Sequence, residues 1–441
     1  MPNRAYYALA VLFTINLINF FDRTIFGAIG ESIRREWGLG DAAIGALGTA
    51  FTLLYAAVGV PLGRLSDKFS RKRILGAGLF VWSFLTAASG LARNYWQLFS
   101  VRLGVGVGEA TCAPAANSLI GDLFPTAQRA WALSIFMLGL PIGNALSYAI
   151  GGPVTQAFGW RTAFFVAGLP GLLCVLALVW VHEPPRGMVE DHAVGDRRRP
   201  GSPYALVLSI PTMWWLIASG ALHNFNMYAI AQFLSPFLIR FHGTSIRQAG
   251  LLATVIYGLS GVAGLLAGGT LADAAYRRRK DGRLLVGAAA ITIAAPFMFL
   301  ALGRPAGDVL GFSLLMGTGC GVMYAYYSSV YSTIQDIIEP SLRGTAMALY
   351  FFAMYVLGAS LGPVGTGLAS DHFTIEAATS AGVLEHTPHA LEPFRGAGLH
   401  SAMYVIPAIF GLLAVVLFVA SRTVTSDVEK LRAWMRAPNV A

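Results

Sequence analysis

Apolar residues occur in long runs along the chain, separated by short polar stretches. A helix needs about 20 predominantly apolar residues to cross a bilayer. Runs of this kind occur at residues 6–29, 42–63, 74–92, 97–121, 131–157 and 162–182, and again at 212–239, 246–272, 284–303, 307–335, 344–370 and 400–421. The pattern predicts an all-α integral membrane protein with twelve transmembrane helices in two halves of six.

The polar stretches divide the chain into four expected parts. The N-terminal half is expected at 1–182 and the C-terminal half at 212–422. Between them, 183–211 contains a stretch rich in Pro, Gly and charge, which indicates a cytoplasmic linker. Residues 423–441 place apolar and charged side chains on opposite helix faces, which predicts a cytoplasmic amphipathic tail on the inner membrane surface. Residues 371–399 are expected to form an outer surface loop, which we favour over a metal site.

Composition supports membrane insertion and argues against a soluble protein. Hydrophobic residues make up 56% of the chain and charged residues 12%, whereas charged residues make up about a quarter of soluble domains. The 50 Gly and 21 Pro suit packed membrane helices better than a barrel. The three cysteines lie within apolar runs and are expected to be core residues.

The net charge of +9 is a topology signal. With both termini on the cytoplasmic side, 21 of the 31 basic residues fall in cytoplasmic segments and eight in outer ones. This distribution gives no reason to expect a nucleic-acid partner. We expect a multi-pass protein of a bacterial inner membrane.

Three short sequence patterns of the N-terminal half recur in the same order in the C-terminal half. Residues 63–67 match 269–273, Asp122 matches Asp336, and residues 143–146 match 358–361, at offsets of 206, 214 and 215. These pairs predict two six-helix halves in parallel arrangement.

The predicted helix 97–121 carries two charges at membrane depth. Arg102 and Glu109 are seven residues apart, nearly two full turns, so their side chains project from one face. A charge at this depth costs at least about 2.5 kcal/mol, so such residues normally face a bundle interior or a hydrated cavity. Gly104, Gly106 and Gly108 allow a neighbouring backbone to approach closely.

The first apolar run contributes a second polar face. Asn16, Asn19, Asp22 and Arg23 fall within an arc of about 120°. Asp22 is expected to titrate, although a static ion pair is the alternative. Adjacent residues point about 100° apart, so Asp22 and Arg23 need not pair and could each find a partner on 97–121.

Glu109 is the preferred proton carrier. Burial favours its neutral form and a nearby arginine favours its ionised form, so the distance to arginine would control proton binding. Permanent pairing of Glu109 is the alternative. The expected proton-coupling residues are Glu109, Asp22, Arg23 and Arg102.

Acidic residues at the ends of predicted spans suggest gating contacts. Asp67 and Asp273 each precede a basic cluster and could cap a helix or pair with Arg343 or Arg129 across the halves. Asp41 precedes the second span, where an N-cap would also explain it. The expected gate residues are Asp41, Asp67, Arg71, Arg129, Asp273 and Arg343.

The C-terminal half carries polar groups without a mid-membrane charge. His223 and Asn226 share one face of 212–239, and Tyr324, Tyr327 and Tyr331 form a stripe on 307–335. Helix packing explains these groups as well as substrate contact does. The expected substrate-binding residues are Asn19, Arg23, Asn117, Asn144, His223, Asn226, Tyr324 and Tyr327.

Several of these stretches resemble the major facilitator superfamily. Residues 63–72 resemble its loop-2–3 motif, with Ser70 in place of the usual glycine. Residues 102–109 resemble its fourth-span motif, and 139–143 with 151–153 its fifth-span motif. Phe21-Asp22-Arg23 and residues 105–125 are similar to the Spinster branch. The resemblance implies transport of lysolipids or sphingoid lipids such as sphingosine-1-phosphate, and proton coupling.

These observations predict a monomeric proton-coupled transporter of an amphipathic lipid-like substrate. It would work by alternating access around a mid-membrane site. A multidrug or small organic anion antiporter is the alternative within this class. A lipid-acting membrane enzyme is disfavoured because no nucleophile–base set appears, and a channel is disfavoured by the repeat. No cofactor or metal is expected.

Overall fold

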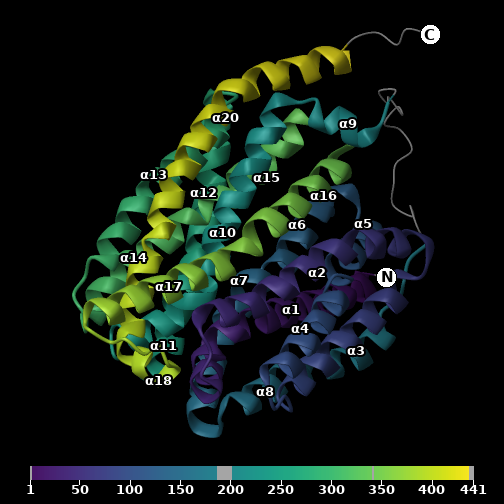
Figure 1. Cartoon of the computed structure of the whole chain (residues 1–441). Helices are drawn as coiled ribbons and strands as arrows, with labels where there is room; N and C mark the ends of the chain where they lie inside the picture. Colours follow the sequence, from purple (N-terminus) through teal and green to yellow (C-terminus); the bar gives the residue numbers. More distant parts are fainter. Residues whose placement is uncertain (1, 186–200, 340–341, 437–441) are drawn as a thin grey trace. The chain divides into compact units, whose positions relative to one another are not determined.

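The computed structural model describes residues 2–185, 201–339 and 342–436, and all regular elements within these ranges are helical (Figure 1). Within them, nine helical segments are long and apolar enough to cross a membrane. The predicted all-α class is therefore confirmed.

The chain forms two compact units that do not coincide with the halves of the sequence. The first contains residues 2–185 together with 231–258 and 363–399, and the second contains the remaining described residues. The first unit is built mainly from α1 (Pro2–Trp37), α2 (Asp41–Lys68), α3 (Arg71–Ser89), α4 (Tyr95–Glu109), α5 (Cys112–Leu123), α6 (Thr126–Met137), α7 (Gly139–Phe158) and α8 (Trp160–Val179).

The later elements contribute to both units. They are α9 (Pro203–Leu208), α10 (Pro211–Arg240), α11 (Ile246–Ala253), the π-helix η1 (Thr254–Leu259), α12 (Ser260–Arg278), α13 (Gly282–Leu302), α14 (Val309–Met323), α15 (Ala325–Ile337), α16 (Arg343–Ala353), the π-helix η3 (Met354–Ala359), α17 (Leu361–Ser380), α18 (Pro388–Leu391), the 3₁₀-helix η4 (Glu392–Phe394), α19 (Arg395–Met403) and α20 (Val405–Arg436). The C-terminal part of α10, all of α11 and most of α17 belong to the first unit.

The expected single span 97–121 is divided into α4 and α5 by a turn at Ala110 and Thr111. Pro114 lacks a backbone N–H, so it cannot donate to the carbonyl of Ala110. The Thr111 hydroxyl donates to Gly108 O at 2.8 Å. A similar break separates α14 from α15 at Tyr324, which is 214 residues beyond Ala110 and so has the offset of the internal repeat.

The expectation of a surface loop at 371–399 is wrong for most of that segment. Helix α17 continues to Ser380, and α18, η4 and α19 follow. Three charged residues of this segment, Asp371, Glu392 and Arg395, have partners of opposite charge, as described below. The C-terminal residues expected as a separate tail continue α20 without a break as far as Arg436.

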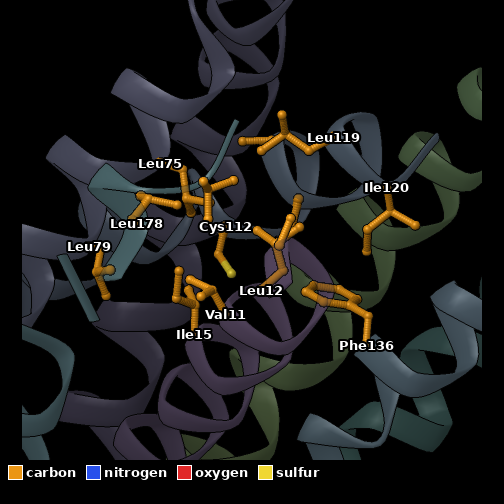
Figure 2. Packing of buried hydrophobic residues seen from close by; sticks show 14 of the residues in the cluster. Val11, Leu12, Ile15, Leu75, Leu79, Cys112, Leu119, Ile120, Phe136 and Leu178 are labelled. Atoms are coloured by element: carbon orange, nitrogen blue, oxygen red, sulfur yellow. The ribbon is translucent and has the colours of Figure 1, made fainter. Parts of the chain in front are cut away.

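A cluster of buried apolar side chains holds the first unit together (Figure 2). Leu12 of α1, Leu79 of α3, Cys112 of α5, Phe136 of α6 and Leu178 of α8 are all buried in it. Helix association within a membrane depends on close packing and not on exclusion of water. The interdigitated side chains of Figure 2 therefore fix the helices that carry the functional residues.

Candidate functional site

Four charged side chains of α1 and α4 form a buried group, here called the central charge cluster: Asp22, Arg23, Arg102 and Glu109. Arg23 Nε donates to Glu109 Oε2 at 2.7 Å, and these side chains are 5% and 0% exposed. Asp22 is buried and accepts a hydrogen bond from Thr86 Oγ1 of α3 at 3.2 Å. The two adjacent residues of α1 therefore have different partners.

The hydrogen bonds of the central charge cluster are incomplete. Arg102 is buried and interacts electrostatically with both Asp22 and Glu109. Among the residues that the structure describes, its Nε and Nη1 have no hydrogen-bond partner, and the same holds for one oxygen each of Asp22 and Glu109. Buried polar groups are normally satisfied. Asp22, Arg102 and Glu109 therefore each keep at least one atom that can take part in a further hydrogen bond.

A larger charge cluster lies where α1 ends and α2 begins. Arg240 of α10 binds Asp41 through two hydrogen bonds of 2.7 and 2.8 Å. Its Nε donates to Glu31 Oε2 at 2.7 Å. All three side chains are at most 5% exposed. One arginine of the later sequence thus neutralises two buried carboxylates of the first two helices.

Further ion pairs extend this group. Arg34 donates to Glu31 at 3.1 Å and to Glu392 at 3.0 Å, and Arg395 donates to Asp371 at 3.0 Å. We call the whole group the terminal charge cluster, with members Glu31, Arg34, Arg35, Asp41, Arg240, Asp371, Glu392 and Arg395.

The explanation of Asp41 as an N-cap is wrong. The N-cap residue of α2 is Gly40, and the Asp371 carboxylate accepts the backbone N–H groups of Asp41 and Ala42 at 2.9 Å. The Asp41 carboxylate instead accepts from Arg240 and from Ser370 Oγ. This position agrees with the expected gate role, which remains a prediction.

The other expected gate residues have partners nearer in sequence. Asp273 lies within α12, so it does not cap a helix, and it pairs with Arg283 at 2.8 Å. Arg283 is the second residue of α13, directly after the short turn that follows α12, and its side chain can therefore reach Asp273. Arg343 donates to the backbone oxygen of Gln335.

Two gate predictions cannot be placed. The side chains of Asp67 and Arg129 lie outside the described residues. The linker residues 186–200 also lie outside them.

Arg71 is a buried anchor of the first unit. It pairs with Asp122 and Glu183 and donates to Pro184 O at 2.8 Å. Burial raises the pKa of Glu183, but hydrogen bonds from Ser70 and Arg71 outweigh burial and hold this pKa below its usual value. Arg71 bonds to Ser118 and Asp122 of α5 and to the segment that follows α8, so it links α3 to both. Arg283 makes the equivalent contact with Asp336 in the second unit.

The expected substrate residues of the N-terminal half occupy three environments. Asn19 lies beside Glu109, but its Nδ2 has no hydrogen-bond partner among the described residues. Asn144 accepts a hydrogen bond from Thr24 at 2.7 Å, as a helix-packing residue does. Asn117 is exposed on α5.

The second unit contains a buried aromatic group around His223 of α10. Its ring stacks on Tyr326 with centroids 3.9 Å apart, and Tyr327 lies edge-on at 4.9 Å. Neither ring nitrogen of His223 has a hydrogen-bond partner within the described parts of the chain. Tyr327 also lies between Tyr324 at 6.0 Å and Tyr331 at 5.4 Å, so the expected stripe is present.

Two polar groups complete this region. Asn226 donates to Ile406 O at 3.0 Å, which is a packing contact. The Tyr326 hydroxyl, which the sequence did not single out, lies 2.8 Å from those of Ser219 and Tyr350. In the described ranges no group of three or more His, Cys, Asp or Glu side chains could hold a metal ion.

Comparison with known proteins identifies the family. The sequence profile of the Major Facilitator Superfamily matches residues 12–363. The chain belongs to this superfamily. It is therefore a multi-pass membrane transporter and not an enzyme, as the sequence predicted.

Relatives place this superfamily member in the Spinster branch. It is 31% identical to protein spinster homolog 1 of Mus musculus, over 82% of this chain and 72% of that protein. It is 27% identical to the sphingosine-1-phosphate transporter SPNS2 of Danio rerio, over 85% and 77%. It is also 28% identical to an MFS-type efflux pump of Mycolicibacterium smegmatis, over 85% and 86%.

A solved structure shares the fold. The crystal structure of a bacterial homologue of the human lysosomal transporter Spinster, in an inward-facing and unoccupied conformation, has a TM-score of 0.85 and 27% identity. The similarity covers 96% of this chain and 98% of that one.

Proposed function

We propose that this superfamily member is a proton-coupled secondary transporter of amphipathic lipid-like substrates, such as a lysophospholipid or a sphingoid phosphate. It works as a monomer by alternating access, in a bacterial inner membrane. In this proposal twelve helices span the membrane in halves 1–182 and 212–422, joined by linker 183–211, and both termini and the tail 423–441 are cytoplasmic.

The central charge cluster is the single observation that carries proton coupling. Desolvation favours the neutral acid and a neighbouring cation favours the anion. A buried carboxylate that binds either an arginine or a proton can therefore couple proton binding to a movement of the arginine. Glu109 has one arginine in hydrogen-bond contact and a second within electrostatic range. Glu109 is the proposed carrier, with Arg23 and Arg102 as its partners and Asp22 as the second acid.

The terminal charge cluster supports a gate on the side opposite the termini. In the proposed topology, the ends of α1 and α10 and the start of α2 face outward. Arg240 joins residues of both sequence halves through buried contacts, and an outward-facing state would have to break them. Asp67, Arg129, Asp273 and Arg343 remain proposed contacts of the opposite gate, with Asp273 held by Arg283.

The lipid-like cargo rests on two lines of support. One relative is named as a sphingosine-1-phosphate transporter. The buried central charge cluster lies in the N-terminal half. The aromatic group around His223 offers apolar accommodation in the other half. Asn19, Asn117, Asn226, Tyr324 and Tyr327 remain proposed contacts. The efflux pump among the relatives supports the second candidate, a multidrug or small organic anion antiporter.

Reconstituted liposomes test the proposal. Fluorescent lysophosphatidylethanolamine and a fluorescent organic anion are offered in parallel, with and without an imposed pH gradient. We expect movement of the lysolipid to respond to the gradient. Glu109→Gln should bind the lysolipid but lose this response, because glutamine mimics the protonated acid.

Two outcomes would contradict the proposal. A Glu109→Gln protein with a normal response would exclude Glu109 and transfer the role to Asp22. Movement of the organic anion alone would favour the second candidate.

A further inference from the structure

Tyr276, near the end of α12, contacts basic side chains from three parts of the second unit. The guanidinium carbon of Arg283 lies 4.1 Å from the centre of its ring, and Lys280 Nζ lies 5.7 Å from it. Arg432, in the last turns of α20, donates from Nη2 to the Tyr276 hydroxyl at 3.2 Å. A cation is attracted to an aromatic face. One tyrosine therefore links the turn after α12, the start of α13 and the end of α20.

The basic residues around this ring carry more charge than their acidic neighbours balance. We call them the basic patch, with members Arg277, Arg278, Arg279, Lys280, Arg283 and Arg432. Arg279 pairs with Asp281. Arg283 pairs with Asp273 and Asp336. Within the parts of the chain that the structure describes, the other four members have no ion pair, and three of these four are exposed.

The end of α20 brings apolar side chains to the same end of the unit. Helix α20 has 32 residues, which is about 48 Å of helix, whereas the hydrocarbon core of a bilayer is about 30 Å thick. Its last turns therefore extend past the core, and in Figure 1 they run at an angle to the earlier ones. Val428 and Leu431 are buried there, whereas Met435 is 45% exposed. Apolar side chains next to a group of cations are typical of a segment that lies on an anionic membrane surface.

We propose that the basic patch is a binding site for anionic phospholipids, in which Arg277, Arg278 and Lys280 bind the phosphodiester of a head group. This inference rests on the proposed function only for its orientation, which places the patch at the inner leaflet. Guanidinium groups suit phosphate oxygens because their N–H groups form a planar fork. Tyr276 is the positioning residue, because its contacts hold Lys280, Arg283 and Arg432 close together against their mutual repulsion.

The exposure of these cations favours a lipid over a soluble phosphate. An exposed cation gains little from a single hydrated anion. A membrane presents many anionic head groups at one level, and each additional lysine or arginine strengthens the attraction to that surface. The apolar side chains at the end of α20 add affinity for a bilayer and none for a soluble anion.

Native mass spectrometry of the purified protein tests this site without cargo or a pH gradient. Phosphatidylglycerol and phosphatidylcholine with the same acyl chains are compared, with inorganic phosphate as competitor. We expect phosphatidylglycerol to bind more tightly than phosphatidylcholine and to stay bound when phosphate is added. Arg277→Gln combined with Arg278→Gln should weaken phosphatidylglycerol binding about thirtyfold. Arg93→Gln combined with Arg247→Gln removes two exposed arginines of the first unit and should leave binding unchanged.

A further variant separates a positioned site from a diffuse excess of charge. Tyr276→Leu keeps every charge but removes the contacts of the ring and the hydroxyl. It should weaken phosphatidylglycerol binding about fivefold, the effect expected when exposed cation–ring contacts are lost. Tyr276→Phe loses only the bond to Arg432 and should weaken binding about twofold. If Tyr276→Leu does not fold, Tyr276→Phe decides the role of the tyrosine.

Three results would each overturn the lipid site: equal binding of the two lipids, displacement by inorganic phosphate, or unchanged binding in the double arginine variant of α12. Unchanged binding in a folded tyrosine variant would overturn the positioning role of Tyr276. Failure of the proposed function is a separate result. A protein that binds phosphatidylglycerol but moves no lysolipid in liposomes would contradict the proposed function and support this site.

Discussion

Arg240→Gln provides the sharpest test of the terminal charge cluster. The substitution leaves Asp41 buried without its ion-pair partner, whereas Glu31 keeps Arg34 and Arg35. Removing one partner of a buried ion pair costs about 3–5 kcal/mol, because the remaining charge is uncompensated. Here the cost falls on the state in which the cluster is assembled, since water can solvate the carboxylates once it is open.

This energy is large compared with a conformational equilibrium. A change of about 3 kcal/mol alters a population ratio by more than a hundredfold. If the gate is closed in most molecules, Arg240→Gln should make the open state prominent. Arg161→Gln is a matched control, because its pair with Glu36 is about 40% exposed and such pairs contribute less than about 1 kcal/mol.

Distances between spin labels measure this shift. Trp96 in the N-terminal half and Leu384 in the C-terminal half are 69% and 88% exposed, so cysteines there can be labelled in a background without the native cysteines. We expect a second, longer distance in Arg240→Gln and none in Arg161→Gln. Equal distance distributions in both variants would refute the gate. Adding Asp41→Asn to Arg240→Gln should recover part of the original distribution, because one uncompensated charge is then removed.

Three other substitutions test individual contacts by thermal unfolding in detergent. Glu183→Gln should cost about 1.5 kcal/mol at pH 7. Because folding lowers the pKa of Glu183, this difference should shrink as the pH falls below the usual pKa of a glutamate and disappear below the pKa of the folded state; a constant difference would contradict the ionic origin. Gly106→Ala should cost about 1–3 kcal/mol through contact with the Phe51 backbone, whereas Gly411→Ala, where the added methyl group meets open space, should cost nothing. His223→Phe should keep the stack on Tyr326 and stabilise the protein by about 1 kcal/mol, because two unsatisfied nitrogens are removed. Transport by this variant should fall if His223 binds cargo, and unchanged transport would assign the histidine to packing.

The sequence revealed the elements that depend on local pattern. Apolar run length predicted the all-helical class, and within the described residues nine helical segments are long and apolar enough to cross a membrane. The seven-residue spacing of Arg102 and Glu109 predicted that both lie on one face of the helix. The charges of that face could be recognised because every residue between Arg102 and Glu109 is apolar or glycine. The repeat was visible because both halves preserve the same turns, and it recurs in the paired contacts Arg71–Asp122 and Arg283–Asp336.

The sequence could not reveal contacts between distant segments. Arg240 and Glu31 are 209 residues apart, and each follows an apolar run, where charges normally face water. The predicted loop contained Asp371, Glu392 and Arg395. A hydropathy scale gives a charged residue the same value whether it forms an ion pair or is solvated, so it could not show that these residues are paired. The N-cap prediction also failed for Asp41. An acidic residue at the start of a helix resembles an N-cap in the sequence, whether or not a distant arginine binds it.

The balance of charge in the two clusters has an electrical consequence. The terminal charge cluster has four arginines and four carboxylates, and the central one has two of each. A unit charge that crosses the membrane gains or loses about 2.3 kcal/mol per 100 mV, whereas a neutral group that moves as a whole gains nothing. In the proposed alternating-access cycle, we therefore expect the empty protein to reorient at a rate that does not depend on the membrane potential. A proton on Glu109 would give the central cluster a charge of +1, so voltage would act on the loaded protein alone and would drive the cycle in one direction.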